Sequence, residues 1–176
     1  MRFTHPRVFL ALWPDGPARA ALAGLPLPAA AVPVHPDDLH LTLAFLGPLT
    51  CEDPAAWLAQ RLPVPGPPVR VQLDALEHWE GPQVVCATGE CSEVTALVDR
   101  LQPGLLQAGK APGRRPFRAH VTLARKARLP RGAARDPWRI DGAHPLSWVS
   151  DRLSLVASQP DSDGRRYHEV AALRFG

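Results

Sequence analysis

The sequence has no hydrophobic stretch long enough to cross a membrane. Its longest apolar run near the start, residues 8–13, is far shorter than the roughly 18 residues that a membrane-spanning helix needs. No apolar region with a small-residue cleavage site follows Met1, so no export signal is expected. Cysteine is also scarce, with three residues that lack the even number and spacing of a disulfide framework. These absences predict a cytoplasmic protein with reduced cysteines and no membrane contact.

Lysine is nearly missing, because all but 2 of the 20 basic residues are arginine. An excess of Arg, Ala and Pro is typical of a GC-rich coding sequence, which is one explanation for the preference. It does not explain the clustering: residues 100–139 carry 11 basic residues and 1 acid, whereas residues 1–99 carry 5 arginines and 11 acids. A guanidinium group binds two phosphate oxygens at once. The cluster therefore predicts a phosphate-bearing partner that lies along or beside this segment.

Proline and glycine are frequent, with 21 and 13 residues in a chain of 176. They interrupt the sequence every few residues and exclude a coiled coil. A hydrophobic content of 45% excludes a disordered chain, because it is enough to offset chain entropy. The length fits one domain, spanning residues 1–176, that can be built from two small lobes.

Alternating apolar residues, helix caps and turn residues predict eight strands and three helices. The strands are 7–13, 38–46, 69–76, 83–88, 117–124, 146–149, 152–157 and 167–175, and the helices are 16–25, 53–62 and 92–107. Strands 69–76 and 83–88 are expected to form a hairpin, and residues 161–164 a turn. Pro103-Gly104 is expected to break or kink the third helix.

Strand 38–46 is predicted to be apolar on one face and free for chemistry on the other. Its alternation places Leu39, Leu41, Leu43 and Phe45 together and His40, Thr42 and Ala44 opposite them, up to a stop at Gly47-Pro48.

The order strand, helix, histidine-bearing strand, helix can be followed twice along the chain. Short strands that are close in sequence favour antiparallel pairing. We therefore predict an α+β, bilobal fold with a pseudo-twofold duplication, in which antiparallel sheets flank a central groove and the helices lie outside.

Two copies of the pattern His-x-Thr-Leu carry the strongest chemical signal. One is His40 to Leu43 and the other is His120 to Leu123, each on a predicted strand. A single copy fits a histidine that merely faces solvent, but a pair of copies eighty residues apart does not. On a strand, residues two apart share a face and lie roughly 6.6–6.8 Å apart. Two such strands around a pseudo-twofold would place two imidazoles and two hydroxyls around one phosphate.

Two histidines with ordinary pKa values near 6.5 can be held one neutral and one protonated at physiological pH. Such a pair provides the base and the acid for reaction at phosphorus. Arg118 shares the predicted face of His120, and Arg125 ends the same strand, so either can balance negative charge on the reacting phosphate.

Residues 40–47 (HLTLAFLG) and 115–125 (RPFRAHVTLAR) resemble the two signatures of the 2H phosphoesterase superfamily. Within it, the chain is most similar to the RNA 2′,3′-cyclic phosphodiesterase family, also called 2′-5′ RNA ligase-like. Residues 7–11 (RVFLA) resemble the opening strand of that family and residues 164–167 (GRRY) its closing Gly-x-x-Tyr. Ala119 stands where the family often has proline, which affects the expected local rigidity and not the chemistry.

This resemblance implies a bilobal α+β fold with both motifs facing a central groove. It implies His40 as proton donor and His120 as proton acceptor, with Thr42 and Thr122 holding phosphate oxygens and Arg125 beside them. It implies no metal and no organic cofactor. The expected partner is RNA with a 2′,3′-cyclic phosphate end, and the protein is expected to be a monomer without an obligate protein partner.

The remaining candidates carry weaker signals. Phe9, on the opening strand, is a candidate for base stacking. Five tryptophans also could stack bases, but their spacing favours core or rim positions. Cys86 and Cys91 do not have the spacing of a zinc pair.

The leading functional prediction is hydrolysis of RNA 2′,3′-cyclic phosphates to 2′-phosphomonoesters by two-histidine catalysis. Reversible 2′-5′ ligation of RNA ends is the alternative within the same chemistry. A non-catalytic module that binds RNA ends is the alternative from another class, although binding alone has no use for two complementary histidines.

Overall fold

The computed structural model describes residues 2–62, 66–110, 116–128, 138–140 and 146–176. Within these ranges the elements are β1 Phe3–Leu12, α1 Gly16–Ala23, β2 Val32–Pro33, a 3-10 helix Pro36–Asp38, β3 Leu41–Cys51, α2 Pro54–Arg61, β4 Val69–Leu73, β5 Ala75–Trp79, β6 Val84–Thr88, α3 Ser92–Gln107, β7 His120–Arg125, β8 Trp138–Arg139, β9 Leu146–Ser150, β10 Arg152–Ser158 and β11 Tyr167–Arg174. None of the described helices is long and apolar enough to cross a membrane.

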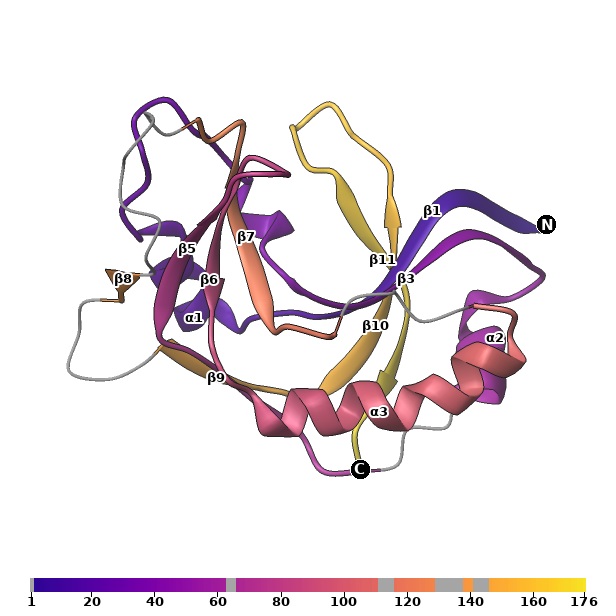
Figure 1. Ribbon diagram of the computed structural model, residues 1–176. Coiled ribbons are helices and arrows are strands. Elements are labelled where there is room, and N and C mark those ends of the chain that lie inside the picture. Colours follow the sequence, from indigo (N-terminus) through magenta and orange to yellow (C-terminus); the bar gives the residue numbers. More distant parts are fainter. Residues whose placement is uncertain (1, 63–65, 111–115, 129–137, 141–145) are drawn as a thin grey trace.

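One large sheet contains nine of the strands, and its two halves meet at a narrow seam. The order is β11-β10-β1-β3-β7-β6-β5-β8, with β2 paired to β7, while β4 and β9 form a separate pair. All of these pairings are antiparallel. At the seam, β3 and β7 share a single register pair, Leu41 with Val121. The halves rise on either side of this seam in Figure 1, which confirms the bilobal α+β prediction.

The internal duplication is visible in the strand pairing. In one half, β1 leads through α1 to β3, and β1 and β3 are antiparallel neighbours. In the other half, β6 leads through α3 to β7, and these strands are likewise antiparallel neighbours. Each unit is therefore strand, helix, histidine-bearing strand. The seam between β3 and β7 lies where a twofold axis relating the units would pass.

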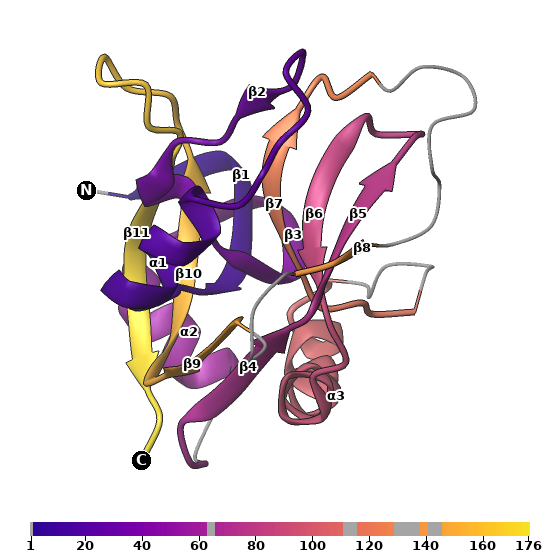
Figure 2. The same cartoon turned by 90° about the vertical axis from the view of Figure 1, so that its left-hand side faces the viewer.

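The core is built mainly from leucine side chains that both halves contribute. Leu10 and Leu41 from one half, and Leu76 and Leu97 from the other, are fully buried. Helix α1 contacts β9, α2 contacts β11 and α3 contacts β4, so the helices cover the ends and outer side of the sheets (Figure 2). Burial of this apolar surface holds the two halves together and fixes the geometry of the seam.

The predicted caps of the first two helices are confirmed. The Asp15 carboxylate accepts a hydrogen bond from the Ala18 N–H at 2.8 Å at the start of α1. The Asp53 carboxylate does the same for the Ala55 N–H at 2.8 Å, and Pro54 occupies the first position of α2. These contacts satisfy amide groups that the first turn of a helix leaves unpaired.

The prediction for the far end of the first histidine-bearing strand is wrong in two respects. Strand β3 continues to Cys51 through Gly47, whose φ of +67° is readily adopted by glycine, and Pro48. Phe45 is not on the buried face but is 76% exposed. The pairing of β1 with β3 contains irregularities on both sides of Phe45, and each extra residue inverts the alternation beyond it.

The predicted hairpin of 69–76 with 83–88 is partly wrong. Residues 69–73 form β4 and pair with β9, and the hairpin partner of β6 is β5, which begins at Ala75. The chain passes from one sheet to the other at Asp74. Strand β4 alternates buried and exposed residues and contacts α3, whereas β6 is buried throughout.

Pro103 does not interrupt α3, which runs through it from Ser92 to Gln107. Pro103 and Asp99 are exposed, so water can bind the Asp99 carbonyl that lacks an N–H partner. Gly104 has a packing role instead, because a Cβ atom there would lie 2.2 Å from the Arg61 carbonyl oxygen at the end of α2. The dipeptide therefore allows α2 and α3 to approach closely.

Candidate active site

The single pair at the seam brings the two His-x-Thr motifs together. His40 directly precedes β3 and His120 begins β7. Because Leu41 pairs with Val121 in antiparallel register, His40 lies opposite Thr122 and Thr42 lies opposite His120. All four side chains point to the face opposite the buried Leu41 and Val121. The histidines are thus diagonal neighbours, which in a regular sheet are about 7–8 Å apart.

Both histidines are oriented by the same backbone contact. Nδ1 of His40 lies 2.6 Å from the carbonyl oxygen of Asp38, and Nδ1 of His120 lies 2.8 Å from the carbonyl oxygen of Arg118. A carbonyl oxygen can only accept, so Nδ1 carries the proton in each ring. In the neutral imidazole, Nε2 is then an acceptor. Nε2 of His40 lies 3.1 Å from the Thr42 hydroxyl, which donates to it.

The motifs line a pocket of about 440 Å³ that crosses the seam. It is lined by Arg7, Val8, Phe9, His40, Thr42, Phe45, Gly47, Trp79, Pro82, Val84, His120, Thr122, Arg125, Ser158, Arg166 and Tyr167. Six of the seven residues that the sequence nominated are in this set. The seventh, Arg118, is not.

Arg118 is instead bound outside the pocket. Its guanidinium forms an ion pair with the carboxylate of Glu77 and lies 5.7 Å from the centre of the Trp79 ring. Glu77 also accepts hydrogen bonds from the Trp79 indole and the Thr88 hydroxyl, both at 2.9 Å. Trp79 in turn packs against His120 at a tilt of 53°, with ring centres 4.6 Å apart. Arg118 and Glu77 therefore support the wall beside His120.

Glu77 keeps a negative charge beside that wall. Burial alone would raise the pKa of Glu77, but the hydrogen bonds from Trp79 and Thr88 and the charge of Arg118 outweigh it and hold the pKa below its ordinary value.

Phe9 lines the pocket but is only 4% exposed. Its ring packs against His40, with ring centres 4.9 Å apart, and edge-on against Tyr167 at 5.2 Å. Phe45 lies 6.1 Å from Phe9 and is the exposed aromatic residue of this wall. The sequence pattern gave no signal for Phe45, because strict alternation assigned it to the core.

Arg125 reaches across the seam from β7. Its Nη2 donates a hydrogen bond of 2.9 Å to the Tyr167 hydroxyl on β11. The Tyr167 ring meets His40 edge-on, with ring centres 4.8 Å apart. A cation from the second half is thereby held beside the histidine of the first.

The two imidazoles are neutral at physiological pH, for related reasons. Burial lowers the pKa of His40 to about 4; the Asp38 carbonyl and charge oppose this, and the charges of Arg125 and His120 add to it. Burial also lowers the pKa of His120 and the charge of Arg118 adds to this, while the Arg118 carbonyl and the Glu77 charge act in the opposite direction. An anion placed between the rings would raise both pKa values.

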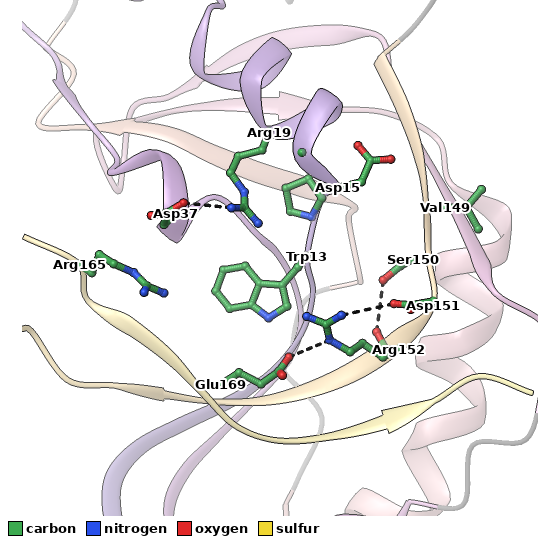
Figure 3. A pocket seen from close by; sticks show the side chains of 12 residues that line it. Trp13, Asp15, Arg19, Asp37, Val149, Ser150, Asp151, Arg152, Arg165 and Glu169 are labelled. Atoms are coloured by element: carbon green, nitrogen blue, oxygen red, sulfur yellow. Dashed lines mark hydrogen bonds and ion pairs between the residues drawn. The ribbon is translucent and has the colours of Figure 1, made fainter.

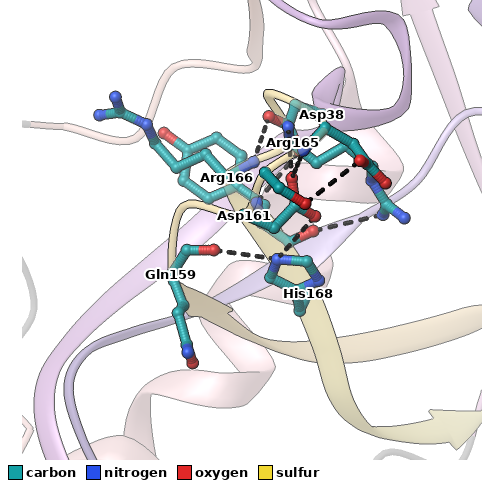
Figure 4. A network of polar contacts seen from close by, with 9 residues as sticks. Asp38, Gln159, Asp161, Arg165, Arg166 and His168 are labelled. Atoms are coloured by element: carbon teal, nitrogen blue, oxygen red, sulfur yellow. Dashed lines mark hydrogen bonds and ion pairs between the residues drawn. The ribbon is translucent and has the colours of Figure 1, made fainter.

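Asp38 ties the closing segment of the chain to the first motif, a role that sequence reasoning missed. Its buried carboxylate accepts hydrogen bonds from the N–H groups of Arg166 at 2.7 Å and Tyr167 at 3.1 Å (Figure 4). Nothing in the sequence distinguishes Asp38 from its neighbour Asp37, which forms an ion pair with Arg19. Its importance depends on a contact between residues 128 positions apart.

The segment that Asp38 holds is shaped by the predicted turn at 161–164. The carboxylate of Asp161 accepts hydrogen bonds of 3.0 Å from the N–H groups of Asp163 and Arg165, and Gly164 has a φ of +85°. Within the same network, Nε2 of His168 lies 2.9 Å from the Gln159 carbonyl oxygen (Figure 4).

Cys86 lies beside the second motif, on the neighbouring strand β6. It is opposite Thr122 in the register of β6 with β7, and its thiol lies 3.8 Å from the Thr122 hydroxyl. Burial raises the pKa of the Cys86 thiol to about 11, so it stays protonated. In the described ranges, no three His, Cys, Asp or Glu side chains gather into a group that could hold a metal ion.

A larger cavity of about 760 Å³ lies on the other side of Trp13 (Figure 3). Its charges are largely paired: Arg19 with Asp37 at 3.0 Å, and Arg152 with Glu169 at 3.1 Å. Trp13 contacts His40 with ring centres 5.5 Å apart, so the indole separates this cavity from the histidine.

The basic segment 100–139 is only partly described. Within the described residues of this segment, Arg125 is the one basic residue that lines the pocket, and Arg128 is exposed away from it. Residues 111–115 and 129–137 lie outside the described ranges, so the predicted role of the segment in RNA binding stays a prediction.

Two bacterial proteins are similar to the chain in sequence. A Thermus thermophilus protein named RNA 2′,3′-cyclic phosphodiesterase is 34% identical in an alignment of 146 residues that covers 77% of this chain and 71% of that protein. An Escherichia coli protein of the same name is 36% identical over 104 residues, 57% of this chain and 58% of that protein.

The fold is also similar to solved structures. The crystal structure of E. coli LigT complexed with 3′-AMP matches with a TM-score of 0.78 and 27% identity, covering 97% of this chain and 98% of that one. A family model described as the 2′-5′ RNA ligase superfamily matches residues 18–161. The chain therefore belongs to the 2′-5′ RNA ligase superfamily.

Proposed function

We propose that the protein is a hydrolase that opens 2′,3′-cyclic phosphate ends of RNA to 2′-phosphomonoesters. The observation that carries the proposal is the Leu41–Val121 pair, which places two imidazoles and two hydroxyls on one face of one pocket. The names of its relatives in T. thermophilus and E. coli support the same reaction.

The reaction needs one base and one acid on opposite sides of phosphorus. Nε2 of His120 accepts a proton from water, and the water oxygen forms a bond to phosphorus. The bond from phosphorus to the ribose O3′ breaks in line, and Nε2 of His40 supplies the proton that O3′ gains. The phosphate stays on O2′. Both Nε2 atoms are available for this exchange because both Nδ1 atoms are bound to backbone carbonyls.

The bound substrate itself stabilises the protonated form of His40, which the role of acid requires. Both histidines have lowered pKa values in the free protein, so neither holds a second proton at neutral pH. The cyclic phosphate is an anion, and its charge between the rings stabilises an imidazolium. Binding and protonation of His40 are then coupled.

The remaining groups hold the phosphate. Thr42 and Thr122 are neutral donors on either side of the seam, and Arg125 brings a fixed positive charge to the same pocket. Donors that are already oriented stabilise the developing charge at phosphorus without reorganisation. Phe9 supports His40 from behind, and we assign the exposed contact with a base to Phe45.

We further propose that one chain forms the whole catalytic unit and acts as a monomer. The pocket is lined from both halves of the sheet of a single chain, so no second copy is needed to complete it. Size-exclusion chromatography with light scattering should give a mass near 19.1 kDa.

The test is incubation with adenosine 2′,3′-cyclic phosphate in the presence of EDTA, with the product identified by chromatography. Turnover to adenosine 2′-phosphate is expected. Release of adenosine 3′-phosphate would contradict the placement of O3′ at His40. Absence of turnover would contradict the proposed enzymatic activity and favour the alternative, a module that binds RNA ends without catalysis.

Reversible 2′-5′ ligation uses the same groups, with a ribose hydroxyl in place of water, and the name of the matched superfamily favours testing it. An RNA with a 2′,3′-cyclic end and a second RNA with a 5′-hydroxyl should be incubated together. If the joined RNA forms in a larger amount than the hydrolysed RNA, ligation is the main activity.

A further inference from the structure

The proposed reaction fixes on which side of phosphorus the nucleoside lies. Water attacks from the side of His120, and the departing O3′ faces His40 because His40 protonates it. O2′ and O3′ belong to the same ribose, so the ribose also lies on the His40 side. The rest of the RNA is attached to that ribose through its 5′ oxygen. The phosphate that follows must therefore pass along the wall of the pocket that belongs to β1, β3 and β11.

Arg7 brings a positive charge to that wall through an irregularity in β1. Arg7, Val8 and Phe9 all line the pocket, although consecutive residues of a regular strand point to opposite faces. The register shifts between His5 and Val8, where the Arg7 N–H donates to Nδ1 of His5 at 3.2 Å. Bulges of this kind redirect side chains beside binding sites.

Arg166 brings a second positive charge from the start of β11. Its backbone N–H is held by the buried carboxylate of Asp38 at 2.7 Å. Figure 4 shows its side chain extending away from the Asp38 contacts, on the side opposite to Arg165. Arg166 lines the reaction pocket, whereas Arg165 lines the larger cavity beyond Trp13.

Both guanidinium groups lack a counter-charge within the part of the chain that the structure describes. Among the described residues, neither the Arg7 nor the Arg166 side chain forms a hydrogen bond or an ion pair, and both residues are exposed. The other arginines near the histidines are engaged: Arg125 with Tyr167, and Arg118 with Glu77. Two free cations at one wall of a phosphate pocket are suited to a second phosphate.

We propose that Arg7 and Arg166 bind the phosphate on the 5′ side of the terminal nucleotide, so that RNA leaves the pocket along β1 and β11. This inference rests on the proposed function, since that reaction sets the orientation of the ribose. It also predicts that the preferred substrate carries a 5′ phosphate on its terminal nucleotide, in addition to the 2′,3′-cyclic phosphate.

The experiment compares adenosine 2′,3′-cyclic phosphate with the same compound carrying a 5′-phosphate. In the wild-type protein, kcat/KM is expected to be about tenfold or more higher for the 5′-phosphorylated substrate, as one or two charge-assisted hydrogen bonds allow. The difference should appear mainly in KM. In the Arg7→Ala, Arg166→Ala double variant, the ratio of the two values should fall to near one.

Arg128→Ala is the control, because it removes an exposed arginine outside the pocket, and Arg118→Ala tests the opposite wall, where Arg118 is paired with Glu77. Both should keep the wild-type ratio. A ratio that falls in Arg118→Ala and not in the double variant would place the nucleoside along the Trp79 wall and overturn the proposal, as would a wild-type ratio of one.

A binding measurement separates this inference from the proposed function. Adenosine 2′,5′-bisphosphate should bind about tenfold more tightly than adenosine 2′-phosphate by calorimetry, and the double variant should lose the difference. If neither cyclic compound is turned over, the proposed reaction fails. The subsite itself is refuted by equal affinities of the two nucleotides for the wild type.

Discussion

The two His-x-Thr motifs have the same sequence pattern and the same backbone contact, yet they lie in different surroundings. His40 is enclosed by the rings of Phe9, Trp13 and Tyr167, whose centres are 4.8–5.5 Å from its own. Burial in this aromatic environment lowers the pKa of His40 to about 4. The first motif therefore holds a ring that resists protonation until an anion arrives.

The second motif is more polar. Among the described residues, His120 has one aromatic ring contact, with Trp79, and the ion pair of Glu77 with Arg118 lies next to Trp79. Burial lowers the pKa of His120 and the Arg118 charge adds to this, while the Arg118 carbonyl and the Glu77 charge oppose it. A duplicated motif has thus become two unequal reagents through its neighbours. Catalysis at phosphorus requires one group to give a proton while the other takes one. The free protein disfavours the charge on His40, the proposed donor, so the anionic substrate must stabilise its imidazolium.

Removal of either imidazole is expected to have the largest effect. His40→Ala and His120→Ala should each lower kcat about 10²–10⁴-fold, because each removes one proton-transfer group. The double variant should lose little more than either single variant, since both groups act in one step. Steady-state kinetics on a 2′,3′-cyclic nucleotide measures this. His78→Ala, outside the pocket, is the control, and near-full activity in either single variant would rule out the two-histidine mechanism.

Acid should weaken the fold mainly through the first motif. The folded-state pKa of His40 is depressed from 6.5 to about 4, so the unfolded chain binds the proton more readily. Stability is fully present above pH 6.5 and is lost as the pH falls toward 4, by about 3 kcal/mol from this group.

Urea unfolding at pH 7 and pH 4.5 measures that loss. The His40→Gln variant should lose less stability than the wild type over the same interval, and His120→Gln should differ less from the wild type. Identical losses of stability in all three proteins would show that the aromatic rings around His40 do not disfavour its protonated form.

Arg125 tests whether the two halves act together, because it belongs to β7 and is held by Tyr167 of β11. Arg125→Ala should cost about 1.5–3 kcal/mol in kcat/KM through loss of a charge-assisted contact. Arg125→Lys should recover part of it, since an ammonium group cannot bind two oxygens as a planar fork. Full activity in Arg125→Ala would transfer the charge-balancing role to another arginine.

The threonines should show the smallest effect and a difference between the motifs. Thr42→Ala removes a donor to phosphate and the hydroxyl that lies 3.1 Å from Nε2 of His40, whereas Thr122 has the Cys86 thiol beside it at 3.8 Å. We expect losses of about 0.5–1.5 kcal/mol in kcat/KM, larger for Thr42→Ala. Thr→Ser variants should retain most activity. A loss equal to that of the histidine variants would mean that the hydroxyls take part in proton transfer.

Much of the site was predictable because its key residues obey local rules. Strand alternation placed His40 with Thr42 and His120 with Thr122 on one face each, and that depends only on the period of the backbone. The helices capped by Asp15 and Asp53 follow from hydrogen bonds within one turn. Phe45 was misplaced because irregularities in the pairing of β1 with β3 reverse the alternation, and a partner strand imposes them.

By itself, the sequence determined the groups of the candidate site: two imidazoles, two hydroxyls and an arginine on strands that must expose one face. Only the tertiary structure decided how they meet and how they differ. The Leu41–Val121 pair joins segments eighty residues apart, and Asp38 binds the backbone of Arg166 and Tyr167 across 128 and 129 positions. The burial, ring contacts and nearby charges that set the pKa of each histidine depend on which distant segments the folded core brings together. A local sequence pattern does not encode these contacts.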